Sequence, residues 1–149
     1  MEVSKGDTVT VSVEGTVQEV RLYGVMCPVR GQPFYDKARD LVRVWVLQKN
    51  AEIIPVFKDS DGMTNALVRV EASQDYVNSK LISFGMAWVK PLCRGKFCVE
   101  WKRLESLAQQ NGVGLWSESP SIPPWEWEKA MRQIIRDKTM ESKGQGKVQ

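Results

Sequence analysis

The chain has 149 residues, 42% of them hydrophobic and 26% charged, which is enough for one sizeable core and hardly for two. Its formal net charge of +3 falls well short of the dense positive field that by itself indicates nucleic-acid binding. Histidine is absent, which removes the commonest general base and metal ligand, and no apolar run approaches the roughly 20 residues of a membrane span.

Alternation of polar and apolar residues predicts that the first third is a β-meander. From Asp7 to Val13, threonine and serine alternate with valine, the period-two pattern of a half-buried strand. Glu14 and Gly15 form a turn signal, and the β pattern resumes from Val17 to Tyr23. From Phe34 to Trp45 the apolar residues recur at helical spacing, which predicts an amphipathic helix.

The rest of the chain predicts short strands followed by helices. We expect strands at 51–57, 65–71 and 86–89, and helices at 77–84 and 98–110. Two prolines, Pro123 and Pro124, open a last helix from Trp125 to Asp137. The polar residues 138–149 predict a disordered tail, so a single domain would span residues 1–137. Periodicity alone supports an α+β fold with an antiparallel sheet.

The three cysteines allow one local disulfide. Cys93 and Cys98 flank a loop short enough to be closed by a disulfide, whereas Cys27 stands alone. The sequence leaves open whether Cys93 and Cys98 are paired or reduced. Without histidine, a zinc site is poorly supplied. The start of the chain, from Met1 to Lys5, lacks the basic and apolar stretch of a signal peptide. We therefore expect either a cytoplasmic protein or the mature part of an exported precursor.

Several segments together resemble the staphylococcal nuclease-like (thermonuclease) family, its bacterial members especially. The matching segments are Gly6–Val9, Val20–Val25, Gly31–Arg39, Val77–Trp88 and Trp101–Trp127, and they stay in register over roughly residues 5 to 130. The resemblance implies an α+β fold dominated by a small β-barrel of OB type. Such a fold would have five short strands, one helix inserted after the third, and about three helices.

Members of that family cleave phosphodiesters of DNA and RNA with Ca²⁺. The resemblance places Asp7 at a metal carboxylate and Arg21 at a phosphate-binding arginine. Met26 stands where the family has its second metal carboxylate, and Val29 stands at the general-base glutamate. Met63 replaces the second phosphate-binding arginine. The resemblance therefore implies a degenerate active site.

These losses predict little catalysis of the family's type. Ca²⁺ takes six to eight hard oxygen ligands, and the Met26 thioether is too soft to be one. A missing general base costs about 10²–10⁴ in rate, and a missing charge-stabilising donor roughly 10²–10³. We expect no cofactor to bind tightly, with Asp7 as a weak Ca²⁺ candidate if the protein is active.

Three functions stay open. The leading hypothesis is an inactive or weakly active nuclease-fold domain that binds single-stranded nucleic acid or a protein, without a membrane partner. The alternative is an active metal-dependent phosphodiesterase whose site is rebuilt from nearby carboxylates, namely Asp36, Asp40, Asp59 and Asp61. Those four are more typical of a solvated turn and of a helix's polar face. A structural or protein-interaction module is the third possibility.

The remaining candidate residues have simpler interpretations beside the functional ones. Asp7 and Arg21 are expected to form an ion pair across adjacent strands, and Cys27 is typical of a small buried hydrophobe. The tryptophans could stack on bases but are more typical of core residues: Trp88, Trp101, Trp116, Trp125 and Trp127. A basic stretch is either a solvated face or a phosphate-binding surface: Lys90, Arg94, Lys96, Lys102 and Arg103.

Overall fold

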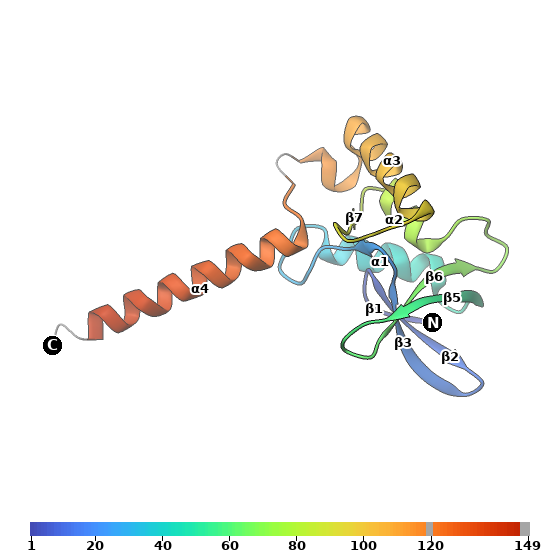
Figure 1. Cartoon of the computed structure of the whole chain (residues 1–149), viewed down its shortest axis with the longest axis horizontal. Helices are drawn as coiled ribbons and strands as arrows, with labels where there is room; N and C mark the ends of the chain where they lie inside the picture. The colour runs from blue at the N-terminus through green and yellow to red at the C-terminus, as the bar shows by residue number, and fades with distance from the viewer. Residues whose placement is uncertain (119–120, 147–149) are drawn as a thin grey trace.

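A five-stranded sheet, a two-stranded sheet and four α-helices make up this chain in a computed structural model that describes residues 1–118 and 121–146 (Figure 1). No helix in these residues combines the length and the apolar character that crossing a membrane requires. The structure is a small α+β fold, as the sequence predicts, but its larger sheet is mixed and not purely antiparallel as expected. The described residues contain the four α-helices expected from periodicity, where the resemblance implies about three.

The larger sheet has the strand order β1-β2-β3-β6-β5. Its strands are β1 (Glu2–Lys5), β2 (Thr8–Val13), β3 (Thr16–Leu22), β5 (Ala51–Lys58) and β6 (Thr64–Val70). All neighbours are antiparallel except β3 and β6, which pair in parallel. Helix α1 (Tyr35–Val46) enters after the third of these strands, as expected. This order and this insertion are those of an OB-type fold.

A second, two-stranded sheet joins β4 (Val25–Met26) to β7 (Trp88–Val89). Its two strands lie 63 residues apart in sequence, counted from Val25 to Trp88. Their pairing places the segment after β3 next to the segment that precedes α3. The sequence pattern predicted a strand over 86–89 but neither β4 nor β1. Strands of two and four residues are too short to display a period.

The register between β2 and β3 decides which side chains enter the core. Val9 pairs with Val20, and both are fully buried. Thr8 pairs with Arg21, one position away on the strand, which points Arg21 to the other face. Burial of Val9, Val11, Val20 and Leu22 therefore fixes where Arg21 can stand.

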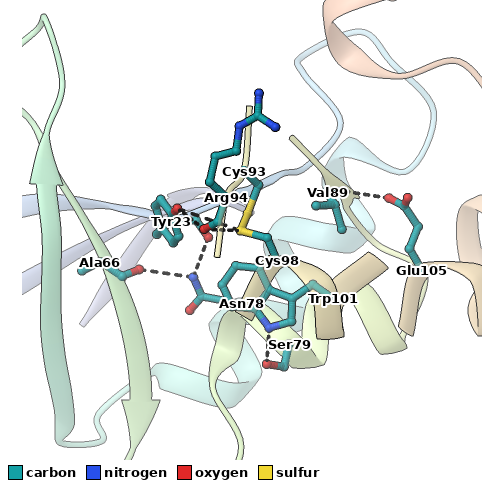
Figure 2. Close-up of a disulfide and its surroundings, with 10 residues drawn as sticks. All are labelled: Tyr23, Ala66, Asn78, Ser79, Val89, Cys93, Arg94, Cys98, Trp101 and Glu105. Carbon is teal, nitrogen blue, oxygen red and sulfur yellow. Dashed lines mark hydrogen bonds between the residues drawn. A yellow bond between two sulfur atoms is a disulfide. The ribbon is translucent and has the colours of Figure 1, made fainter. Parts of the chain in front are cut away.

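The helices of the second half pack on one another beside the sheet. They are α2 (Val77–Ser83), α3 (Lys96–Asn111) and a 3₁₀ turn (Gly114–Ser117). Trp101 of α3 is 1% exposed, and its indole Nε1 donates to Ser79 Oγ at 2.8 Å (Figure 2). Asn78 of α2 is fully buried, with its Nδ2 donating to the carbonyls of Tyr23 and Ala66. These bonds tie α2 to the ends of β3 and β6.

The last helix, α4 (Pro124–Gly146), is longer than the sequence predicted and projects away from the rest of the molecule (Figure 1). The end expected at Asp137 is wrong, because the helix continues through residues 138–146. Lys138, Met140 and Glu141 are good helix formers, and no glycine or proline interrupts positions 138–143. The polar composition of this segment therefore predicted disorder where the structure has an exposed helix. Of the predicted tail, residues 147–149 lie outside the described residues.

Candidate functional site

The residues expected to carry chemistry gather where β2, β3 and the turn before β6 meet. Asp7 directly precedes β2, and Arg21 lies near the end of β3, opposite Thr8. The turn from Asp59 to Met63 leads into β6, which pairs with the same end of β3. The sheet therefore brings together segments that are distant in sequence, such as Arg21 and Asp61, which stand 40 residues apart.

Asp7 accepts hydrogen bonds from its neighbour Thr8 and from the loop that follows β4. Its Oδ2 accepts a hydrogen bond from the backbone N–H of Cys27 at 3.0 Å, and its Oδ1 accepts one from Thr8 Oγ1 at 3.2 Å. The expected ion pair between Asp7 and Arg21 is wrong: within the part of the chain that the structure describes, the carboxylates within salt-bridge distance of Arg21 come from the Asp59 turn. The cause is that the parallel β3–β6 pairing delivers two closer carboxylates.

Arg21 is held by two acidic side chains. Its Nη1 lies 2.7 Å from Asp59 Oδ2 and 3.2 Å from Asp61 Oδ2. Partial burial works to lower the pKa of Arg21, but the hydrogen bonds to the two carboxylates outweigh it and raise that pKa above its usual value. Two carboxylates therefore offset the charge of Arg21, at the position where the resemblance places a phosphate-binding arginine.

Asp59 organises the turn as well as the arginine. Its Oδ1 accepts the backbone N–H groups of Asp61 and Met63, and its Oδ2 accepts a hydrogen bond from Asn65 Nδ2 at 3.0 Å. The hydrogen bond from Asn65, followed by those from Met63 and Arg21, lowers the pKa of Asp59 below its usual range. The interpretation of Asp59 as part of a merely solvated turn is therefore wrong, although Asp61 is 68% exposed. An aspartate that begins a turn and is followed by a second aspartate and a glycine was the signal for this cap.

The donor set does not suit Ca²⁺. Met26, Val29 and Met63 are all half-buried and supply no carboxylate, while both oxygens of Asp7 already accept hydrogen bonds. Among the described residues, no group of three or more acidic or cysteine side chains could surround a metal ion. A hard cation needs six or more oxygens, but Asp7 accepts hydrogen bonds with both of its oxygens, and Asp59 and Asp61 are paired with Arg21.

The other proposed carboxylates lie on the outer face of α1. Asp36 and Asp40 are 76% and 57% exposed, and both pair with Arg39. Their interpretation as a helix's polar face is confirmed. Cys27 is 2% exposed, and burial raises the pKa of its thiol well above the usual value, with Asp7 adding to the rise. A buried, protonated thiol is a poor nucleophile, so the interpretation of Cys27 as a small buried hydrophobe is also confirmed.

Cys93 and Cys98 form a disulfide at the start of α3, which resolves the two alternatives left open by the sequence (Figure 2). Their Cα atoms lie 5.6 Å apart, and both residues are buried. Tyr23, at the end of β3, donates from its hydroxyl to the carbonyl oxygen of Arg94 at 3.1 Å. The bridge and this bond hold the basic loop between the two cysteines against the sheet.

Exposed cations and aromatic rings occur together around that loop. Arg94 and Lys96 are exposed, and no ion pair within the described residues includes either of them. Phe57 is 49% exposed and contacts the Tyr23 ring edge-on at 6.0 Å, and Phe97 is 42% exposed. We call these five side chains the disulfide-loop surface: Tyr23, Phe57, Arg94, Lys96 and Phe97.

The tryptophans divide between the core and the start of the last helix. Trp88 and Trp101 are 4% and 1% exposed, so their interpretation as core residues is confirmed. Trp116 packs edge-on against Trp88 with ring centres 5.9 Å apart, whereas Trp125 and Trp127 are half-exposed. Phe57 and Phe97 are exposed and could stack on bases. The sequence did not predict this role for them, because neither residue stands in a motif.

Glu105 is a half-buried carboxylate that the sequence analysis did not single out. Its Oε2 accepts the backbone N–H of Val89 at 2.7 Å, which joins α3 to β7 (Figure 2). Burial raises the pKa of Glu105, although the Val89 N–H and Lys102 oppose the rise. Its hydrogen bond gives this carboxylate a structural task.

Comparison with known proteins gives a consistent result. Residues 19–118 match the family described as "Staphylococcal nuclease homologue", a segment that contains Arg21 and the Asp59 turn. Similar proteins include Protein ParB of Escherichia coli, 29% identical over 133 residues that cover 83% of this chain and 74% of the relative. An uncharacterized endonuclease of Haemophilus influenzae is 28% identical over 131 residues, covering 87% of this chain and 71% of the relative. A micrococcal nuclease of Shigella flexneri is 25% identical over 134 residues, covering 85% and 77%.

Proposed function

Because this chain belongs to the staphylococcal nuclease homologue family, we propose that it binds single-stranded nucleic acid on a nuclease fold that has lost the family's Ca²⁺-dependent catalysis. The observation that carries this proposal is the engagement of Arg21 by Asp59 at 2.7 Å and by Asp61 at 3.2 Å. The two carboxylates offset the positive charge of Arg21 and compete with a phosphate for its Nη1, which weakens its ability to stabilise charge in a transition state.

Loss of the metal ligands and of the base supports the same conclusion. Met26 and Val29 stand at the positions of a metal carboxylate and the general base in the resemblance, and neither side chain can bind Ca²⁺ or take a proton. Asp7 keeps its carboxylate but uses it to fix the backbone of Cys27. The retained acid then has a structural purpose that does not require catalysis.

The disulfide-loop surface supports nucleic acid as the partner. Single-stranded DNA and RNA are bound without sequence preference by cations that follow the backbone and aromatic rings on which bases stack. Arg94 and Lys96 supply exposed positive charge, and Phe57 and Phe97 supply partly exposed rings on either side of Tyr23 and Trp101. The bridge between Cys93 and Cys98 holds the loop in place before a ligand arrives, which reduces the entropy lost on binding.

The test is a titration of a fluorescein-labelled oligo(dT) of roughly 8 nucleotides, within the footprint of about 4–16 nucleotides of an OB fold. We expect Arg94→Gln/Lys96→Gln to lower the affinity, and to reduce the slope of log K against log salt by about 1.4, at about 0.7 per lost phosphate contact. The control is Lys37→Gln/Lys49→Gln, which removes two exposed lysines near the ends of α1. Equal effects of the two pairs, or no binding by the unaltered protein, would reject the proposal and leave a protein partner or a structural role.

An active phosphodiesterase is the second candidate, and the names of the endonuclease and micrococcal nuclease relatives favour it. It predicts that the labelled oligonucleotide is shortened during the same titration when Ca²⁺, Mg²⁺ or Mn²⁺ is present. Binding without shortening supports our proposal.

A further inference from the structure

Helix α4 carries a stripe of positive charge along one side. Lys129, Arg132, Arg136 and Lys143 are separated by three, four and seven residues, and such spacings place side chains on one face of an α-helix. All four residues are exposed. At 1.5 Å per residue the stripe is about 21 Å long. We call these four residues the α4 basic stripe.

Helix α4 also carries Glu126, Glu128, Asp137 and Glu141, but within the described residues they make no ion pair with the α4 basic stripe. No ion pair in the described residues includes any of the stripe's four side chains. Glu128 stands four residues before Arg132 but makes no ion pair with it, and Asp137 accepts a hydrogen bond from Gln133. Like charges three and four residues apart destabilise an isolated helix. A polyanion along the stripe would relieve this repulsion.

The other side of α4 is apolar. Met131, Ile134 and Ile135 are 36%, 45% and 64% exposed and lie at helical spacing from Trp127, across the helix from the α4 basic stripe. A basic face opposite an apolar face is also the pattern of helices that lie on lipid, but here the apolar residues of this side end at Ile135 and the charged Lys138 follows them on the same side. The charge distribution thus favours a soluble polyanion over a lipid surface.

We propose that the α4 basic stripe binds the phosphate backbone of a nucleic acid strand, as a second contact outside the OB-type body. This inference rests on the proposed function, since it extends the same ligand beyond the disulfide-loop surface. A nucleic acid strand in a duplex carries one charge per about 3.4 Å of axis, so several phosphates fit along a stripe of about 21 Å. Helix α4 projects from the body, which leaves it accessible to a long strand (Figure 1).

The experiment compares two probes by fluorescence anisotropy, an oligo(dT) of roughly 8 nucleotides and one of about 30, between about 50 and 200 mM salt. Replacing all four residues by glutamine, a good helix former, should lower the affinity for the long probe at least about tenfold and reduce its salt slope by about 3, four contacts at about 0.7 each. Binding of the short probe should not change. Circular dichroism verifies that the helix remains.

A matched pair of single variants tests which face binds. Arg136→Gln removes a charge from the α4 basic stripe, and Lys138→Gln removes a charge, also exposed, from the apolar side of the same helix. We expect only Arg136→Gln to reduce the salt slope for the long probe, by about 0.7.

Failure of this inference differs from failure of the proposed function. If the unaltered protein binds both probes and the fourfold variant binds the long one equally well, the inference on α4 is wrong and the proposed function stands. If the unaltered protein binds neither probe, both are wrong. Sedimentation with anionic phosphatidylserine vesicles that depends on the four residues, without any effect on DNA, would overturn the inference in favour of a lipid surface.

Discussion

Arg21 and Asp59 illustrate at the residue scale how much of this site could be predicted. The positions of Asp7, Arg21, Met26, Val29 and Met63 follow from the match to a family, which fixes their places along the chain. The residues that contact these side chains cannot be predicted in the same way, because those contacts depend on which strands pair in the sheet. Asp59 reaches Arg21 across 38 residues of sequence, through a parallel β3–β6 contact that no local pattern reveals.

The Asp59 network gives a prediction for acid stability. The pKa of Asp59 is lowered in the folded protein, so its stabilisation is present above the unfolded-state pKa of about 3.9 and is lost as the pH falls through the folded value. We expect Asp59→Asn to lower the urea midpoint at pH 7, and this difference from the unaltered protein to shrink below about pH 4.

The control for that prediction is Asp75→Asn, an exposed acid with no ion pair among the described residues. It should shift the midpoint little at either pH. If both variants show the same pH dependence, the ionised carboxylate of Asp59 does not stabilise the folded protein as described.

Helices and strands could be predicted from the sequence where they are long enough for the hydrophobic pattern to repeat. The spans of β2, β3, α1, β5, β6, α2 and α3 lie within a few residues of the expected ranges, because each alternates or recurs over six or more positions. The two strands of two and four residues, β4 and β1, were missed for want of length. For α4 the start was right, since Pro124 marks it, but the end was wrong, because a solvated helix and a disordered tail have the same polar composition.

Docking of α3 on the body depends on one large side chain. Trp101 is 1% exposed and also donates to Ser79, so Trp101→Ala should lower the free energy of unfolding by about 3–5 kcal/mol. Val99→Ala, two residues earlier and 71% exposed, is the control and should stay within about 0.5 kcal/mol. Urea unfolding followed by fluorescence of the other tryptophans measures both. An unchanged midpoint for Trp101→Ala would mean that α3 is not packed as described.

The disulfide makes a separate prediction for the same element. Under denaturing conditions without reductant, we expect one reactive thiol per chain, that of Cys27. The variant Cys93→Ser/Cys98→Ser should lose about 2 kcal/mol of unfolding free energy, the loop-closure value for a bridge over so short a segment. Three reactive thiols in protein prepared under oxidising conditions would contradict the pairing.

At the scale of the whole molecule, composition indicates one core, periodicity predicts an α+β fold, and the resemblance supplies the OB type of the fold. Within that fold Asp7 fixes a loop, and Arg21 is bound by two carboxylates, and on these contacts we base the proposal that catalysis is lost. The disulfide-loop surface contains none of the residues that the resemblance places in the catalytic site, although its Tyr23 follows Arg21 by two positions. The division of the chain into one domain over residues 1–137 stays a prediction.

The central claim, loss of Ca²⁺-dependent catalysis with binding retained, is tested most directly by a quenched single-stranded DNA substrate incubated with the full chain, with and without Ca²⁺. We predict that fluorescence will not rise above the metal-free control, although anisotropy reports that the strand is bound. A Ca²⁺-dependent rise that Asp7→Asn abolishes, in a variant whose unfolding transition is intact, would contradict the account and establish an active nuclease.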